Sequence, residues 1–327
     1  MSLARKSMIV LAALCLSVGL VYLAPSPVFA KAKYITIASG WVTGVYYPFA
    51  GAVSRILWME KEKLAVRATV ESSGASVANA NLIASRDADL ALLQNDIANY
   101  AYYGKLMFKD PIKDMLGIAT LYPETCQIQV RRNAGIKSVA DLKGKRVAIG
   151  PLGSGTEQNA KQILEVYGLT VNDLGKVVQL TSTESADFMK DGRIDAAFYT
   201  TGIGAAVLTD AALMTPCDLV PIDDAHFEKL KAKYPFYAKD VVKAGTYKGL
   251  DRDVPMVAVM AMLVARKGLK KDLVYNVTKA IFEHLDRLHA AHAKLKAVTL
   301  ESAMDGMSIP LHPGAEQYFK EKGILKK

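Results

Sequence analysis

Short apolar runs and longer amphipathic stretches alternate along residues 34–103. Apolar runs of roughly four to eight residues bounded by turn residues indicate strands, whereas apolar residues three or four positions apart indicate helices. On this basis we expect strands over 34–39, 66–71 and 89–94, and helices over 48–59, 77–85 and 96–103. Strands that alternate with helices are typical of a parallel sheet with helices on both faces, so an α/β unit is expected here.

The same order begins again after residue 145. Residues 145–167 indicate a short strand, a glycine-rich turn and an amphipathic helix. An acidic, turn-prone segment leads into a short apolar strand at 85–91, and a similar segment does so at 191–198. This repetition predicts two similar sheet units that face each other across a cleft. In such sheets ligands bind beyond the carboxyl ends of the strands.

Two longer extended runs, over 117–130 and 254–266, interrupt the alternation. We expect them to pair with each other as the two crossings between the lobes, which would make a hinge. A long helix over 272–296, with apolar residues at core spacing, and a last helix that ends near Gly323 are expected in the C-terminal part. The expected fold class is α/β, with two lobes that each hold a mostly parallel sheet flanked by helices, joined by a two-strand hinge.

The N-terminal segment has the pattern of a secretory signal peptide. Two basic residues precede an apolar run over 8–23, and small residues follow at 28–30, so cleavage is expected after Ala30 and the mature protein is expected in the periplasm. The apolar run is shorter than the roughly 20 residues that a membrane-spanning helix needs. The expected organisation is a signal peptide at 1–30, a first part of lobe I at 31–122, lobe II at 123–254, and the hinge return with the second part of lobe I at 255–327.

The chain is basic, with a formal net charge of +9. Residues 1–30 carry two positive charges and no negative ones, so the expected mature chain has a charge of 9 − 2 = +7. The basic residues are scattered among acidic ones, as at 60–63, and form no dense run with interleaved aromatic residues, so we expect no nucleic-acid binding. Cys126 and Cys217 are the cysteines of the mature part, and the sequence leaves open whether they form a disulfide or remain buried thiols.

The turn over 150–155 and the helix that follows it form the first candidate site. The first turn of a helix leaves backbone N–H groups unpaired at the positive end of its macrodipole, and Ser154 and Thr156 add hydroxyl groups beside them. Thr156 is the expected N-cap. A carboxylate can bind such a turn without an arginine. A plain capped turn is the alternative, because the lysine of the Walker A motif and the third glycine of GxGxxG are both absent.

The sequence shows no pattern of catalytic residues. His284 is followed by Leu285, so the metal-binding HExxH motif is missing. Ser73 and Ser154 lack the glycines of the GxSxG nucleophile turn. We therefore expect a protein that is not an enzyme and that has no metal site and no cofactor.

Seven stretches, spread over nearly the whole expected mature chain, carry a family resemblance. They are IASGWVTGVYYPFAGAVSRI, VESSGASVANANLIASRDADLALLQNDIANYAYYG, LYPETCQIQVR, IKSVADLKGKRVAIGPLGSGTEQNAKQILE, DGRIDAAFYTTG, AKYPFYAKDVVKAGTYKG and PLHPGAEQYFKEKG. In this order they resemble the TAXI family of solute-binding proteins, the extracytoplasmic receptors of tripartite ATP-independent periplasmic (TRAP) transporters. Trp41, Ala50 and Ala75 depart from the small residue or glycine that is frequent at these positions in the family.

The resemblance implies a type II periplasmic-binding-protein fold whose lobes close on a small carboxylate, such as glutamate, glutamine or a C4/C5 dicarboxylate like 2-oxoglutarate. It also implies transient docking to the membrane subunits of a TRAP permease, and we expect a monomer. Two alternatives are an ABC-type periplasmic substrate-binding protein and a periplasmic enzyme on the same fold. Carried over position by position, the expected ligand-binding residues are Thr43, Tyr46, Tyr47, Ser73, Gly74, Gln94, Asn95 and Asp96 from the first lobe, and Ser154, Gly155, Thr156 and Tyr199 from the second.

Overall fold

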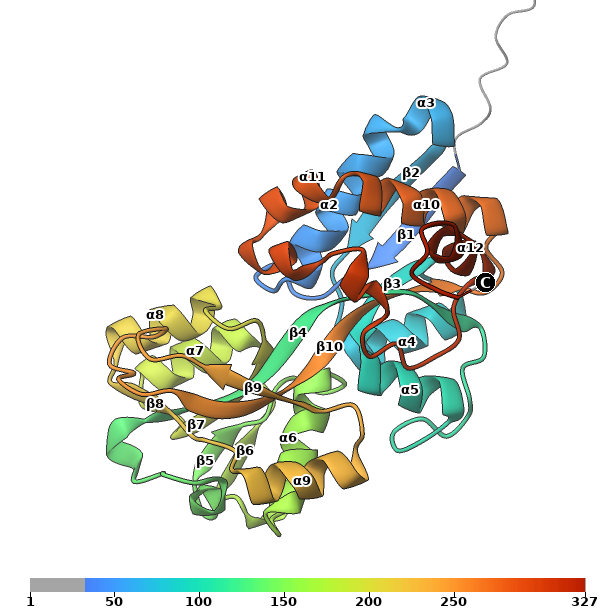
Figure 1. Ribbon diagram of the computed structural model, residues 1–327. Helices are drawn as coiled ribbons and strands as arrows, with labels where there is room; N and C mark the ends of the chain where they lie inside the picture. The colour runs from blue at the N-terminus through green and yellow to red at the C-terminus, as the bar shows by residue number, and fades with distance from the viewer. Residues whose placement is uncertain (1–32, 327) are drawn as a thin grey trace, which may run out of the picture. The chain divides into compact units, whose positions relative to one another are not determined.

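The computed structural model describes residues 33–326 (Figure 1). The expected signal peptide lies outside the described residues. The first part of the described chain alternates strands with helices, as the apolar pattern predicts. Its elements are β1 (Lys33–Ala38), α2 (Tyr46–Met59), α3 (Lys61–Leu64), β2 (Val66–Glu71), α4 (Ser76–Ser85), β3 (Leu90–Gln94), α5 (Asn95–Tyr103) and the long strand β4 (Met115–Arg131).

The second alternation lies between the long strand β4 and a second long strand. After the 3₁₀ turns η1 (Arg132–Ala134) and η2 (Val139–Leu142) come β5 (Arg146–Ala148), α6 (Gly155–Val166), η3 (Val171–Asp173), β6 (Lys176–Val178), α7 (Ser182–Lys190), β7 (Ala196–Thr201), α8 (Ala206–Met214), β8 (Cys217–Leu219), α9 (Asp224–Lys233), β9 (Ala238–Val242) and β10 (Val254–Arg266).

The C-terminal part differs from the single long helix expected over 272–296. It consists of α10 (Lys271–Glu283), α11 (Leu285–Ala291), η4 (Ala293–Ala297), η5 (Glu301–Met304) and α12 (Pro313–Glu321). The helix breaks at His284, whose backbone leaves the helical region at φ −124° and ψ 40°. A second break follows at His292, because α10 and α11 both pack on α2 whereas η4 packs on β4. Periodicity alone did not reveal these breaks.

The described strands form one sheet in the order β2-β1-β3-β10-β4-β7-β5-β6, with β8 beside β4 and β9 beside β10. β1 pairs in parallel with β2 and β3, and β5 pairs in parallel with β6 and β7. The long strands β4 and β10 pair antiparallel with each other, which confirms the expected pairing of the two extended runs (Figure 1). The fold is α/β, with two lobes that each hold a mostly parallel part of this sheet, joined by β4 and β10. The residue boundaries of the lobes stay a prediction.

Helices cover both faces of the first lobe's sheet. Residues of α4 and α5 pack in one buried cluster, and residues of α2, α10 and α12 pack in another. The first of these clusters continues into the second lobe, because α5 also packs near α6 and the ring of Tyr100 meets that of Phe236 edge-on at 5.9 Å. The two lobes thus share an apolar contact on one side of the hinge strands.

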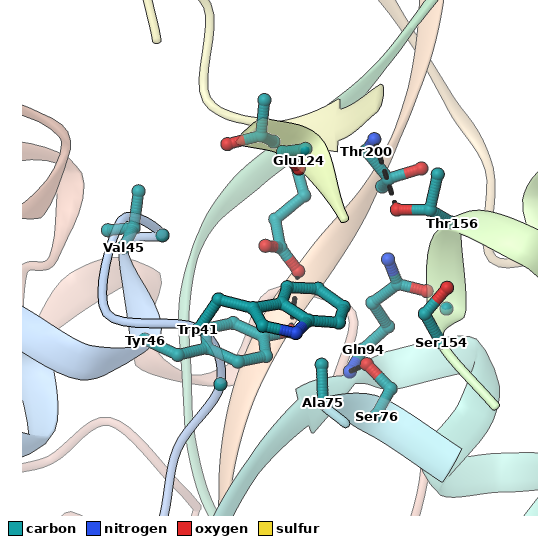
Figure 2. Close-up of a pocket in the computed structure, with 15 residues that line it drawn as sticks. Trp41, Val45, Tyr46, Ala75, Ser76, Gln94, Glu124, Ser154, Thr156 and Thr200 are labelled. Carbon is teal, nitrogen blue, oxygen red and sulfur yellow. Dashed lines mark hydrogen bonds between the residues drawn. The ribbon is translucent and has the colours of Figure 1, made fainter. Parts of the chain in front are cut away.

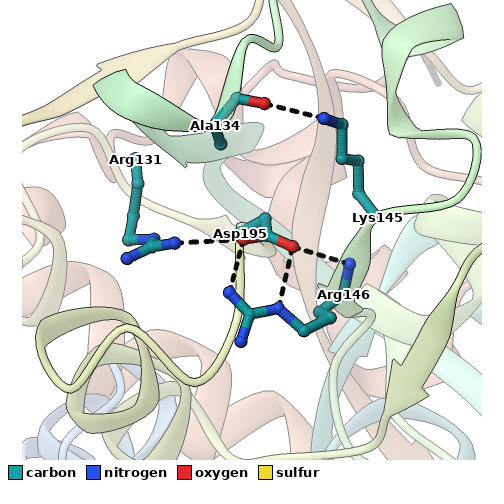
Figure 3. Close-up of polar contacts among 5 residues, drawn as sticks. All are labelled: Arg131, Ala134, Lys145, Arg146 and Asp195. Atoms are coloured by element: carbon teal, nitrogen blue, oxygen red, sulfur yellow. Dashed lines mark hydrogen bonds and ion pairs between the residues drawn. The ribbon is translucent and has the colours of Figure 1, made fainter.

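The repeat that the sequence suggests is visible in how two aspartates hold the lobes' sheets. Asp195 accepts hydrogen bonds from the backbone N–H and the guanidinium of Arg146 and forms an ion pair of 3.1 Å with Arg131, the last residue of β4 (Figure 3). Asp89 accepts from the backbone N–H of β1 at Thr36 and pairs at 2.7 Å with Arg266, the last residue of β10. Each aspartate therefore joins its own sheet to one hinge strand. The guanidinium of Arg131 is therefore paired with Asp195.

Two further observations bear on the class of protein. Within residues 33–326, no helix is both long and apolar enough to cross a membrane. Cys126 and Cys217 are buried and are not joined in a disulfide. The structure therefore selects the free-thiol option of the two that the sequence left open.

Candidate functional site

A pocket lies where the carboxyl ends of the parallel strands of both lobes approach each other (Figure 2). Its cavity volume is about 60 Å³, which is small beside the roughly 300–1,000 Å³ of typical ligand pockets. The lining residues are Gly40, Trp41, Gly44, Val45, Tyr46, Ala75, Ser76, Gln94, Glu124, Ser154, Gly155, Thr156, Ser182, Thr200 and Thr201. None of these lining residues is a lysine, an arginine or a histidine.

Four helices begin at this pocket. Tyr46 is the first residue of α2, Ser76 of α4, Gly155 of α6 and Ser182 of α7, and each of them lines the cavity. The first turn of a helix presents unpaired N–H groups and the positive end of the macrodipole. The convergence of four such ends from both lobes creates a pocket that favours a negatively charged group.

The start of α6 differs in one residue from the sequence expectation. Ser154, not Thr156, is the N-cap: its hydroxyl accepts from the N–H of Glu157 at 3.1 Å. Ser154 is the residue with extended backbone, three positions before Glu157, which is the geometry a capping side chain needs. Thr156 lies inside the first turn, and its hydroxyl oxygen accepts from the N–H of Thr200 at 3.3 Å. This bond ties α6 to the end of β7.

Gln94 reaches across the pocket from the end of β3 towards α6 (Figure 2). Its side chain is 3% exposed, and its oxygen Oε1 makes no hydrogen bond with any described residue. A Cβ atom placed on Gly155 would lie 2.0 Å from this oxygen. Only glycine therefore fits at the first position of α6 while the Gln94 amide keeps its place. An amide oxygen, which carries partial negative charge, occupies the end of α6 in this structure.

Glu124, from the hinge strand β4, is the buried acid of the pocket. The hydroxyl of Tyr46 donates to its Oε2 at 2.7 Å. Burial raises the pKa of Glu124 to about 8, and the charge of Asp96 acts in the same direction, whereas the bond from Tyr46 acts against it. Burial likewise raises the pKa of Tyr46 well above its usual value. At neutral pH the pocket therefore contains mainly a neutral carboxylic acid.

Behind the pocket, a buried polar network joins the two lobes. Asn159 on α6 donates to Asp96 on α5 at 3.2 Å and to the hydroxyl of Tyr237 at 2.7 Å, and it accepts from the hydroxyl of Thr200 at 3.0 Å. The Tyr237 hydroxyl in turn donates to Gln162. Burial raises the pKa of Asp96 to about 7. Because Thr200 also lines the pocket, this network connects the cavity with the contact between α5 and α6.

The structure brings together part of the predicted ligand-binding set. Tyr46, Gln94, Ser154, Gly155 and Thr156 line the cavity. Their expected role in binding a ligand stays a prediction. What it adds is that residues far apart in the sequence face the same space.

The remaining predicted residues lie next to the pocket but outside its lining. Asn95 holds the backbone of Met260 and Gly306, and Ser73 holds the turn before α4 through Asn79. At a strand end successive side chains point to opposite sides, so Gln94 faces the cavity while its neighbour does not. The predicted residues outside the lining are Thr43, Tyr47, Ser73, Gly74, Asn95, Asp96 and Tyr199. Thr43 is exposed and lies 3.3 Å from Thr183 of the other lobe, measured between the hydroxyl oxygens.

Sequence reasoning missed several lining residues, and the repeat could have found two of them. The spacing that separates Asp89 from Asp195 also separates Ser76 from Ser182 and Gln94 from Thr200. Ser182 and Thr200 are therefore the second lobe's counterparts of first-lobe lining residues. Glu124 gave a weaker signal, as a single acid in a strand that is otherwise almost entirely buried.

Metal chemistry finds no support in the part of the chain that the structure describes. Residues 33–326 contain no group of three or more His, Cys, Asp or Glu side chains arranged to hold an ion. The four histidines of the C-terminal part make separate contacts: His284 with Glu60, His289 with the carbonyl oxygen of Val298, His292 with the N–H of Lys294, and His312 with the N–H of Gly314.

Comparison with known proteins gives the family and supports the fold. Three solved structures are similar at 13–16% identity, which speaks for the fold alone. PhnD1 from Prochlorococcus marinus (MIT 9301), in complex with methylphosphonate, matches with a TM-score of 0.56 and 14% identity over 90% of this chain and 97% of that one. A putative L-cystine ABC transporter protein from Listeria monocytogenes matches with a TM-score of 0.51 and 16% identity over 83% of this chain and 98% of that one. A putative periplasmic sulfonate-binding protein, SsuA, from Methylobacillus flagellatus KT matches with a TM-score of 0.50 and 13% identity over 90% of this chain and 96% of that one.

These neighbours agree with the periplasmic-binding-protein fold inferred from the sequence. The model of the NMT1-like family matches residues 37–323, nearly the whole described chain. The match does not distinguish the TAXI subtype within this assignment, so the subtype stays a prediction. By this match, the chain belongs to the NMT1-like family.

Proposed function

We propose that this protein is a periplasmic solute-binding protein that holds a small organic anion in the pocket and delivers it to a membrane transporter. The observation that carries the proposal is the convergence of four helix N-termini on a cavity without a basic side chain. Backbone N–H groups and hydroxyls would donate the hydrogen bonds to the anion, in place of an arginine or lysine side chain. We further propose that it catalyses no reaction and works as a monomer.

The class of transporter has two candidates. The similar structures include proteins named as ABC transporter components and binders of methylphosphonate and sulfonate. This favours the ABC-type alternative over a TRAP receptor for a carboxylate. The seven sequence stretches support the TRAP candidate, with glutamate, glutamine or a C4/C5 dicarboxylate as ligand. Neighbouring genes separate the two: an ATPase gene supports the ABC candidate, and a large multi-helix permease gene supports the TRAP candidate.

The binding proposal is tested with the protein beginning at Lys31. Thermal melting and then calorimetric titration measure binding of a panel that covers both candidates: L-glutamate, L-glutamine, 2-oxoglutarate, succinate, L-cystine, methanesulfonate and methylphosphonate. We expect at least one anion to bind with a dissociation constant in the micromolar range or below, about −8 kcal/mol or stronger. Absence of binding by every member of the panel would overturn the proposal.

Export is tested separately, because it does not depend on the ligand. We propose that residues 1–30 are removed on export. Intact-mass measurement of the exported protein should give a chain that begins near Lys31. A mass that still includes residues 1–30 would contradict this part of the proposal.

A further inference from the structure

The pocket holds one carboxylic acid in a place that favours anions. Glu124 is 6% exposed and lines the same cavity as the starts of α2, α4, α6 and α7. Tyr46 donates to one of its oxygens, Oε2, while Oε1 makes no hydrogen bond with any described residue. Figure 2 shows the carboxyl group of this side chain directed towards the hydroxyl of Tyr46. A bound anion in so small a cavity would lie close to this carboxyl group.

Two negative charges that share a small, water-poor space repel each other strongly, so one of them takes up a proton. The solute's charge is favoured by the helix ends. We propose that Glu124 binds the solute in its protonated form, donates a hydrogen bond to the solute's anionic group, and takes up a proton from solvent where it was ionised beforehand. This inference rests on the proposed function and adds the residue that couples solute binding to pH.

The groups that face Glu124 from neighbouring elements give no compensating positive charge. Tyr46 faces it from α2 and Asp96 from α5, and Tyr122 and Cys126 lie on its own strand. Asp240 on β9 accepts from the hydroxyl of Thr125, the next residue. Lys294, in η4, is a half-buried cation that interacts with Asp240. The surroundings of Glu124 are thus polar and acidic, which favours its neutral form.

The direction of the pH dependence follows from the charge balance. Burial raises the pKa of Glu124 to about 8 in the empty pocket. A bound anion raises it further, so the complex holds more protons than the free protein at alkaline pH. Affinity is therefore constant in the acid range, where the acid is neutral in both states. It falls as pH rises above about 8, towards a limit of about tenfold per pH unit for one linked proton.

The experiment measures affinity from pH 5.5 to 9.5 by calorimetric titration. The probes are the members of the panel that bind in the screen. Where they bind, 2-oxoglutarate, succinate and methanesulfonate are preferred, because these anions keep the same charge across most of this range. Titration at pH 8.5 in two buffers of different ionisation enthalpy gives the number of protons taken up. For the wild-type protein we expect a fall in affinity above about pH 8 and net proton uptake on binding.

The decisive variant is Glu124→Gln, which keeps the shape of the side chain and cannot ionise. We expect its affinity at pH 9.5 to equal its affinity at pH 6 within about threefold, with no proton uptake. Glu228→Gln, on the exposed face of α9, removes one acid far from the cavity and should keep the wild-type profile. Tyr46→Phe removes a bond that lowers the pKa of Glu124, so the fall in affinity should move to higher pH.

Two results would overturn the inference while leaving the proposed function intact. One is loss of binding by a folded Glu124→Gln protein across the whole pH range. The other is proton release, or rising affinity with pH, in the wild-type protein. Either result would mean that Glu124 binds in its ionised form and accepts a hydrogen bond from the solute, for example from an ammonium group of the solute. If Glu124→Gln does not fold, the number of protons that the wild-type protein takes up on binding tests the inference: net uptake supports it, and no uptake or release overturns it. Failure of every member of the panel to bind the wild-type protein would instead overturn the proposed function.

Discussion

The start of α6 depends on the size of a single residue. Gly155 has ordinary helical backbone, and what it provides is space for the Gln94 amide. The residues that need left-handed backbone are Gly150 and Gly153, at φ 90° and 75° in the preceding turn. Glycines in one short turn thus have two different roles: two allow the turn, and one allows the contact between lobes.

We predict that Gly155→Val abolishes solute binding without unfolding the protein. The new side chain would displace the end of Gln94, which is flexible, into the cavity where the solute binds. Affinity should fall more than about a hundredfold, or about 2.7 kcal/mol, in calorimetric titration, while the circular dichroism spectrum persists. Gly51→Ala is the control, because its Cβ meets only the flexible end of Arg55, at 3.4 Å. Wild-type affinity in Gly155→Val would contradict this account of the pocket.

A second prediction at this scale concerns Asp96, whose pKa burial raises to about 7. The unfolded chain releases this proton near pH 4, whereas the folded protein keeps it until about pH 7, so the free energy of unfolding falls as pH rises between these values. One such group contributes a slope of up to about 1.4 kcal/mol per pH unit. Urea unfolding from pH 4.5 to 7 should show a shallower fall for Asp96→Asn than for the wild-type protein. Parallel curves would show that Asp96 ionises normally in the folded state.

Sequence reasoning placed Gln94 at a strand end and Ser154 at a helix start, and both side chains line the pocket. Their role in binding stays a prediction. Glu124 was missed because β4 is buried on both faces, and a buried strand does not reveal which of its side chains borders a cavity. The N-cap was misplaced because serine at 154 and threonine at 156 are both favourable capping residues, and the backbone geometry shows which one caps the helix.

The elements themselves were largely predictable, because strands and helices in this chain have distinct apolar periods. β2 and β10 have the expected bounds, and the other elements predicted over 34–130 differ from expectation by one or two residues. The pattern gave no bounds for α3 or for the elements β6, α7, α8, β8, α9 and β9 of the second lobe. The long C-terminal helix was the error. Its apolar spacing continues through His284, but the helix breaks there and again at His292, where the chain turns from α2 to β4. Periodicity does not encode these changes of direction.

The repeated aspartates give a prediction at the element scale. Asp89→Asn and Asp195→Asn each weaken an ion pair with an arginine at the end of a hinge strand. Each variant should lower the free energy of unfolding by about 2 kcal/mol at pH 7, and the double variant by about the sum, because the two sites share no partner. Urea unfolding measures all three. A double variant no less stable than either single variant would mean that the two sites are coupled.

The contribution of Asp195 to the free energy of unfolding changes with pH in the opposite direction to that of Asp96. Arg146 and Arg131 hold the pKa of Asp195 well below its usual range. The stability that this aspartate contributes is therefore present above about pH 4 and is lost as pH falls through its folded-state pKa. The difference in unfolding free energy between the wild-type protein and Asp195→Asn should shrink below about pH 4 in the same measurements.

For the described part of the molecule as a whole, the cavity volume implies motion. A space of about 60 Å³, narrowed where Gln94 approaches Gly155 from the other lobe, leaves little room for a solute. We therefore predict that the free protein opens about β4 and β10 and that the solute closes it. Small-angle scattering should show a smaller radius of gyration with saturating solute than without it. An equal radius in both states would argue against hinge closure.

The central claim is that a small anion binds at the helix starts that border this pocket. The most direct measurement is a crystal structure of the protein with the tightest-binding anion from the screen. The account predicts the anionic group within hydrogen-bond distance of the N–H groups of Gly155 and Thr156, with the side chain of Gln94 displaced and the Glu124 carboxyl group beside the solute. An anion bound elsewhere, or held by an arginine or lysine side chain, would contradict it.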